Sequence, residues 1–165
     1  MILETIEVGG CRSYIVGCDR TQVAAVIDPE ISAIERYRGL ASKHGLAIRY
    51  AIDTHTHADH FSAVREIARA LNAQVAMSHL SPAPFVDLRL DDGDMLLVGD
   101  MRLTALATPG HTADSTCLLV QDADVDLAGE AAAHRDEAIA VAKQARAVAE
   151  HHPHLREVPA ENEAL

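Results

Sequence analysis

Thr54-His55-Thr56-His57-Ala58-Asp59-His60 places three imidazoles and a carboxylate within six positions, directly after the apolar run Tyr50-Ala51-Ile52-Asp53. Side chains two positions apart in an extended segment project to the same side, so His55 and His57 can reach one ion. The aspartate and the last histidine are adjacent on a turning backbone and can reach a second position. Imidazole and carboxylate suit zinc and iron, and no thiol is near enough in sequence for a closed structural zinc site. The stretch therefore predicts a metal site.

The sequence on either side places this stretch between a strand and a helix. Residues 48–53 predict a buried strand that leads into it. Apolar residues at three- and four-residue steps predict an amphipathic helix over 62–72, with Ser62 near its start. The stretch should therefore lie at the carboxyl end of a strand, where side chains converge and the dipole of the following helix contributes.

The remaining pattern predicts two groups of strands. Residues 2–8, 11–17 and 23–28 should form an antiparallel meander, followed by a helix that ends near His44-Gly45. A short strand at 75–77 precedes a second meander over 88–90, 95–98 and 101–107. Further predicted elements are strands at 115–121 and 125–128, a long Ala-rich helix over 131–151, a last strand at 155–158 and a polar tail at 159–165.

A second motif, Thr108-Pro109-Gly110-His111-Thr112, follows the second meander. Pro and Gly break the strand, so His111 should stand on a loop. With the HxHxDH pattern of residues 55–60, this motif resembles the signatures of the metallo-β-lactamase superfamily. The resemblance implies an α/β fold, an αβ/βα sandwich of two mixed sheets with helices outside. We expect one such domain, in a shortened form, over residues 1–165.

Composition narrows the classes of partner. The net charge of −11 disfavours nucleic acid, whose binding depends on clustered Lys and Arg. No apolar run approaches the roughly 18 residues of a membrane span, and the first residues lack a basic signal-peptide region, so we expect a cytoplasmic protein. The three cysteines form no close-spaced pair and are expected to be small buried residues: Cys11, Cys18 and Cys117.

The resemblance is strongest from residue 11 to residue 120, and there it points to the persulfide dioxygenase and glyoxalase II branches. Both branches act on glutathione-derived sulfur compounds. The dioxygenases hold one iron by a two-His-one-carboxylate triad, and the hydrolases hold two metals bridged by water. The resemblance implies a first metal position at His55, His57 and His111 and a second at Asp59 and His60. Glu130 stands where the family usually carries a ligating Asp.

The back third departs from both branches. A Glu at position 130 displaces its carboxylate by more than about one ångström relative to an Asp, which is a large shift for a ligand. The family's last histidine ligand has no counterpart near 158–161, although His151, His152 and His154 lie just upstream. A stretch of roughly fifty residues is absent after Glu130, and we expect the site to be weakest there.

Three functions follow from these features. The favoured one is a hydrolase in which a hydroxide on Zn²⁺, held as one or two ions, attacks a thioester or ester carbonyl, with Asp59 also in a catalytic role. The second is an Fe²⁺-dependent persulfide dioxygenase that uses His55, His111 and Glu130. The third is a catalytically degraded, metal-bound scaffold. For either enzyme, the expected partner is a small molecule such as a glutathione-derived thioester or persulfide, and uncovered apolar sheet surface favours a homodimer.

Overall fold

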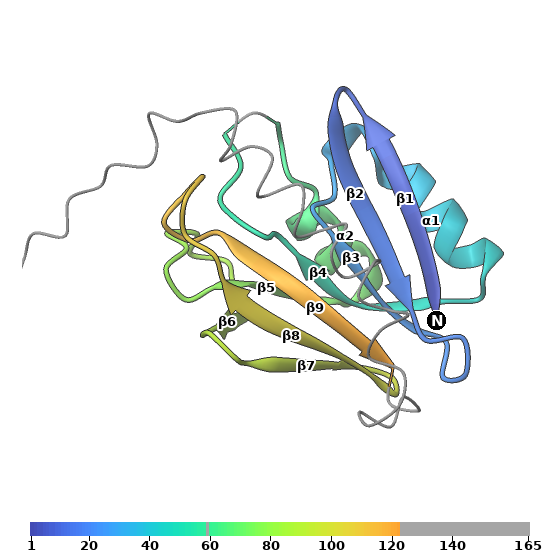
Figure 1. The fold of residues 1–165 in the computed structure, drawn as a ribbon. Coiled ribbons are helices and arrows are strands. Elements are labelled where there is room, and N and C mark those ends of the chain that lie inside the picture. The colour runs from blue at the N-terminus through green and yellow to red at the C-terminus, as the bar shows by residue number, and fades with distance from the viewer. Residues whose placement is uncertain (59, 123–165) are drawn as a thin grey trace, which may run out of the picture.

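Two β-sheets pack face to face in the computed structural model, which describes residues 1–58 and 60–122 (Figure 1). The first sheet has six strands in the order β1-β2-β3-β4-β5-β6, and the second has three in the order β7-β8-β9. The strands of the first sheet are β1 (Ile2–Val8), β2 (Cys11–Gly17), β3 (Val23–Ile27), β4 (Ala47–Ile52), β5 (Gln74–Ser78) and β6 (Leu88–Leu90). Those of the second are β7 (Met95–Val98), β8 (Met101–Ala107) and β9 (Thr116–Asp122).

The first sheet is mixed. Strands β1 to β3 pair antiparallel, which confirms the predicted first meander, and β3 to β6 pair parallel. A 3-10 turn, η1 (Ile31–Ala33), and α1 (Ile34–Lys43) connect β3 to β4, while α2 (Val64–Leu71) connects β4 to β5. Both predicted helices are therefore present. Ser62 lies just before α2 as expected, and its hydroxyl accepts a hydrogen bond from Val64 N at 3.2 Å.

The predicted second meander is partly wrong. Strands β7, β8 and β9 form an antiparallel sheet, but residues 88–90 join the first sheet as β6, parallel to β5. Arg89 stabilises the position of β6, because its guanidinium donates to three carbonyls of the loop between β5 and β6. These are the carbonyls of His79, Ser81 and Ala83. The turn at residues 91–94 then carries the chain across to the second sheet. Alternation of apolar residues predicts a strand, but it does not predict which sheet the strand joins.

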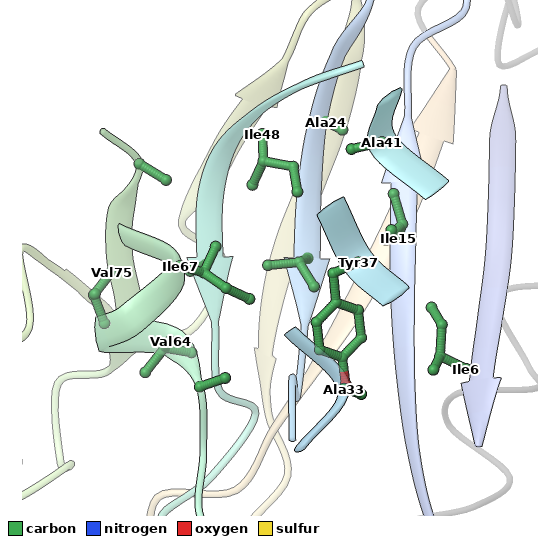
Figure 2. Packing of buried hydrophobic residues seen from close by; sticks show 14 of the residues in the cluster. Ile6, Ile15, Ala24, Ala33, Tyr37, Ala41, Ile48, Val64, Ile67 and Val75 are labelled. Atoms are coloured by element: carbon green, nitrogen blue, oxygen red, sulfur yellow. The ribbon is translucent and has the colours of Figure 1, made fainter. Parts of the chain in front are cut away.

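Two apolar clusters fill the layers, one on each face of the first sheet. On one face, α1 and α2 pack on the strands; Tyr37 of α1 is fully buried between Ile6 and Ile15 (Figure 2). On the other face, side chains such as Val16 and Ile52 meet Met101 and Leu103 of the second sheet. Alternate residues of one strand thus enter different clusters, as the two-residue period of a strand requires.

The described elements have the α/β sandwich arrangement that the sequence predicts. The predicted strands at 125–128 and 155–158, the helix at 131–151 and the tail at 159–165 lie outside the described residues. No helix in the part of the chain that the structure describes is long and apolar enough to cross a membrane. At one edge of the sandwich, Thr116 N donates to Thr54 O at 2.8 Å and joins the two sheets beside the histidine-rich loop.

Candidate metal site

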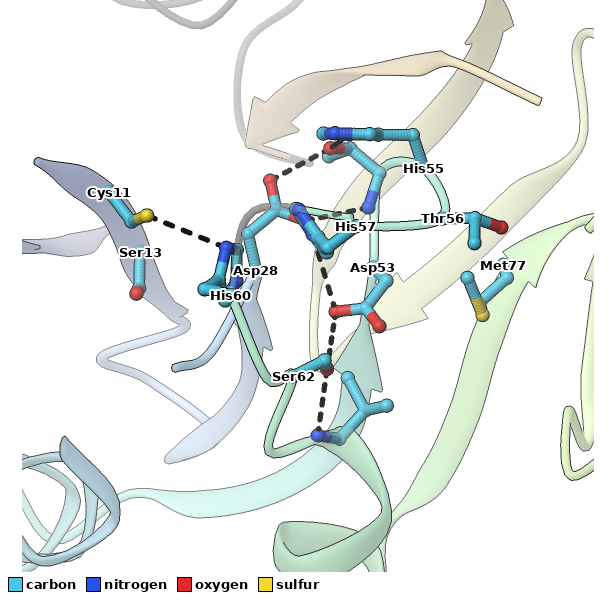
Figure 3. A network of polar contacts seen from close by, with 12 residues as sticks. Cys11, Ser13, Asp28, Asp53, His55, Thr56, His57, His60, Ser62 and Met77 are labelled. Atoms are coloured by element: carbon cyan, nitrogen blue, oxygen red, sulfur yellow. Dashed lines mark hydrogen bonds and ion pairs between the residues drawn. The ribbon is translucent and has the colours of Figure 1, made fainter. Parts of the chain in front are cut away.

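Four imidazoles meet where β4 ends. The ring centroids of His55 and His57 are 4.1 Å apart, and those of His57 and His60 are 4.2 Å apart (Figure 3). His111, from the loop between β8 and β9, lies 5.0 Å from His55 between ring centroids. The first sheet thus supplies three of the rings and the second sheet supplies the fourth. The structure thus brings together four of the residues predicted as metal ligands, namely His55, His57, His60 and His111.

Asp28, the first residue after β3, organises the loop that carries these rings. Its carboxylate accepts hydrogen bonds from Thr54 N at 2.7 Å and from Thr54 Oγ1 at 2.8 Å. It also accepts from His57 Nε2 at 3.1 Å. The residue has a positive φ of 48°, a conformation that aspartate adopts more readily than most residues. Asp28 therefore fixes both the backbone of the loop and one of its histidines.

These bonds assign the metal-binding nitrogen of two rings. An imidazole ligand binds metal through one nitrogen and usually donates its other N–H to a carboxylate or another acceptor. Because His57 Nε2 donates to Asp28, its Nδ1 is the candidate ligand atom. His55 Nδ1 lies 3.0 Å from Thr54 Oγ1, which itself donates to Asp28, so His55 Nε2 is the candidate ligand atom. The donor set and its supports fit a zinc or iron ion.

Asp53 supports His57 from the other side. Its carboxylate is buried, accepts from Ser62 Oγ at 2.9 Å and lies 3.7 Å from His57 Nε2. Burial, followed by the nearby Asp28 carboxylate, raises the pKa of Asp53 to about 7, although His57 and Ser62 oppose the shift. Ligand atoms of Asp28, Asp53 and His57 lie within 4.8 Å of one another, a spacing compatible with an ion. We interpret the two carboxyls as supports of His57, because both lie at its Nε2 and leave Nδ1 as the candidate ligand atom.

Asp114 anchors the loop from the second sheet. Its carboxylate accepts from Thr56 N at 2.9 Å and from Thr56 Oγ1 at 2.6 Å. Burial raises the pKa of Asp114, but hydrogen bonds from Thr56 and Thr112 outweigh burial and hold the pKa below its ordinary value. Thr56 lies between His55 and His57, so this contact ties the histidine loop to the segment that carries His111.

The electrostatic setting favours neutral imidazole at His55. Burial lowers the pKa of His55, and the nearby His57 and His111 rings lower it further. Neutral imidazole is the form that binds a metal.

On the far side of the cluster, Cys11 Sγ lies 3.4 Å from His60 Nδ1. Cys18 and Cys117 are buried, as the sequence predicted for all three cysteines, whereas Cys11 is half-buried at this edge.

Two of the predicted ligands, Asp59 and Glu130, lie outside the described residues. Three carboxylates that the structure places at the site were not predicted from the sequence, namely Asp28, Asp53 and Asp114. Two of them carry a signal in the sequence, because Asp28 and Asp53 each directly follow a buried strand. Polar residues at the carboxyl ends of neighbouring parallel strands meet at one edge of a sheet. Asp114 carries no comparable signal.

Comparison with known proteins agrees with this geometry. The model of the metallo-beta-lactamase superfamily matches residues 6–161. The chain belongs to this superfamily. The mitochondrial persulfide dioxygenase of Homo sapiens is 32% identical over 120 residues, which cover 72% of this chain and 47% of that protein. A hydroxyacylglutathione hydrolase of Rhodopseudomonas palustris (strain BisB18) is 33% identical over 112 residues, which cover 66% of this chain and 43% of the relative.

Solved structures of the metallo-beta-lactamase superfamily are also similar. The crystal structure of ETHE1 from Myxococcus xanthus has a TM-score of 0.70 and 30% identity, covering 73% of this chain and 54% of that one. A metallo-beta-lactamase from Staphylococcus aureus has a TM-score of 0.69 and 32% identity. The chain spans about half the length of the curated relatives it matches. The match shows the superfamily and its fold for this chain, and the curated relatives are enzymes by name.

Proposed function

We propose that the chain is a metal-dependent hydrolase that cleaves the thioester or ester of a small molecule. The observation that carries the proposal is the support of His57, whose Nε2 donates to Asp28 at 3.1 Å with Asp53 behind it. Two buried or half-buried carboxyls beside one imidazole are the support that a metal-ligating histidine receives. A first position built from His55, His57 and His111 needs this ligand. A triad of His55, His111 and Glu130 does not.

Each part of the proposed site has a separate task. His55, His57 and His111 would hold the first ion, and Asp59 and His60 would hold the second. A Zn²⁺ ion there would lower the pKa of its water from nearly 16 to about 7 and polarise the substrate carbonyl. Asp28 keeps the loop and two rings in position through its bonds to Thr54 and His57. Glutathione thioesters are the favoured substrates, because several relatives are named hydroxyacylglutathione hydrolase.

The test compares zinc-loaded variants on a hydroxyacylglutathione thioester in air-free buffer. We expect the wild type to hydrolyse it and His57→Ala to lose at least about 100-fold in kcat/KM, because a first-position ligand is gone. His44→Ala is the matched control, since His44 pairs with Glu4 at the far end of α1. Equal rates for the wild type and His57→Ala would remove His57 from the site and refute the three-histidine position.

The second candidate is an iron-dependent persulfide dioxygenase. It is favoured by the 32% identity to the human persulfide dioxygenase over 72% of this chain. Its iron would be held by His55, His111 and Glu130. This candidate predicts that only the iron form is active, that oxygen is consumed in step with a glutathione persulfide, and that His57→Ala keeps most of the activity. Glu130→Gln should then abolish iron binding, whereas Glu130→Asp should retain it.

A further inference from the structure

A cavity of about 380 Å³ lies at the same edge of the sandwich as the histidine cluster. Its walls come from both sheets: the ends of β5 and β6 on one side and the end of β8 with the start of β9 on the other. The volume lies within the range of small-molecule sites, which is about 300–1,000 Å³. Among the described residues, the four histidines of the metal site and the carboxylates Asp28, Asp53 and Asp114 do not line this cavity.

The cavity is next to the metal site because both share the loop after β8. Pro109 and Ala113 line the cavity, and each is two residues from His111. Two residues of chain span at most about 7 Å, so the cavity wall is within that distance of the His111 backbone. A molecule that reacts at the histidine cluster can therefore extend a side group into the cavity.

One wall of the cavity is held in place before any ligand arrives. Arg89 Nη1 donates to Ser81 O at 2.7 Å, and Arg89 Nη2 donates to Ala83 O at 2.8 Å. These bonds brace the loop that presents Leu80 to the cavity. A braced wall lowers the entropy cost of binding, because little of the protein has to be ordered.

The cavity is lined by both apolar and acidic residues. Leu90 is buried, and Pro109 and Ala113 supply apolar lining from the loop after β8. Asp91 Oδ1 lies 2.8 Å from His79 Nδ1. Asp92 Oδ1 accepts from Ala107 N at 2.8 Å, and Asp92 pairs with no cation among residues 1–58 and 60–122. Among the described residues of the lining, none is Lys or Arg.

We propose that this cavity is a subsite for a short aliphatic chain that ends in an ammonium group. The apolar lining residues would take the methylene groups, and the Asp92 carboxylate would pair with the ammonium. A carboxylate-ended chain would meet two carboxylates, Asp91 and Asp92, among the described lining residues. The substrate of the metal site would then carry an alkylamine on the group that enters the cavity, a link that rests on the proposed function.

Binding is tested on metal-free ¹⁵N-labelled protein, independently of turnover. n-Butylamine, n-butanol and butyrate are titrated at pH 7 and constant ionic strength while amide shifts are followed by NMR. We expect the amides of Ala107 and Ala113 to move, with affinity in the order amine, alcohol, carboxylate. Butyrate binding as tightly as butylamine, or no shift at these amides with any probe, would overturn the proposal.

Two variants assign the binding to the two parts of the cavity. Ala113→Leu fills the apolar body and should abolish the shift at Ala107; Ala47→Leu, at an exposed position at the other end of β4, is the control for size. Asp92→Asn keeps the acceptor for Ala107 N but removes the charge. It should weaken butylamine about two- to fivefold, the range of a partly exposed ion pair, and leave butanol unchanged. Glu35→Gln is the control for charge.

The link to the substrate needs a separate measurement with zinc-loaded protein. We expect a 6-aminohexanoyl thioester to have a lower KM than a hexanoyl thioester, and Asp92→Asn to remove the difference. If hydrolysis occurs but the two substrates and the variant are indistinguishable, the subsite is wrong and the hydrolase stands. If butylamine binds as predicted but no thioester is cleaved, the subsite stands and the proposed reaction is wrong.

Discussion

Asp28 accepts three hydrogen bonds from the histidine loop, and it is not itself a predicted ligand. We expect Asp28→Asn to weaken zinc binding about 10- to 100-fold, the usual effect of losing a carboxylate that supports a ligating histidine. Competition with a chromophoric chelator measures the affinity. Asp19→Asn is the control, because Asp19 pairs with the N-terminal amine at the opposite end of β3. Zinc affinity equal to the wild type would show that Asp28 shapes the loop without acting on the metal.

A second prediction for a single residue concerns Asp114 and how the free energy of unfolding depends on pH. Its folded pKa lies below the unfolded value of about 3.9, so its stabilising effect is complete above that value and is lost as the pH falls through the folded pKa. We expect Asp114→Asn to lower the free energy of unfolding by about 1 kcal/mol at pH 6 and by progressively less below pH 4. Urea titrations at several pH values measure this. A constant difference down to pH 3 would contradict the assigned shift.

At the scale of an element, the hydroxyl of Tyr37 joins α1 to the first sheet inside the core. Tyr37 Oη lies 2.8 Å from Ser13 Oγ of β2 and accepts from Glu30 N at 2.9 Å, and both side chains are fully buried. We expect Tyr37→Phe to cost about 1–3 kcal/mol in the free energy of unfolding, since it leaves buried polar groups without a partner. Denaturant titration measures the cost. Ser13→Ala should cost less in the Tyr37→Phe background than alone, and simple additivity would show that the two groups do not interact.

For the whole molecule, the metal should join the two sheets, because His55 comes from the first and His111 from the second. Zinc at about 100 times its Kd should add about 2.7 kcal/mol of stability, which corresponds to a rise of about 5–10 °C in Tm. Differential scanning calorimetry with zinc or with EDTA measures the shift. His111→Ala should lose most of the shift, and His44→Ala should keep it. An undiminished shift in His111→Ala would place the bound zinc elsewhere.

The sequence predicts the local features of this molecule and misses those that depend on distant contacts. The histidine spacing, the helix before residue 44 and the first meander are patterns within short segments, and the structure has them. The sheet membership of β6 is decided by its pairing with β5. Asp28 and Asp114 meet the histidine loop across 26 and 58 positions of sequence. A periodicity or a spacing motif carries no information about such contacts, whereas the resemblance to a family supplies the fold as a whole.

The hydrogen bond from Thr116 N to Thr54 O joins the two sheets beside His55, and this arrangement bears on the rates of folding and unfolding. The candidate ligands come from separate sheets, so they are brought together only when a long stretch of chain has closed and the sheets have docked. A contact formed after the folding transition state affects the unfolding rate and leaves the folding rate unchanged. We therefore expect zinc to slow unfolding in stopped-flow experiments without accelerating refolding. Faster refolding with zinc would show that the ion binds before docking and helps to direct it.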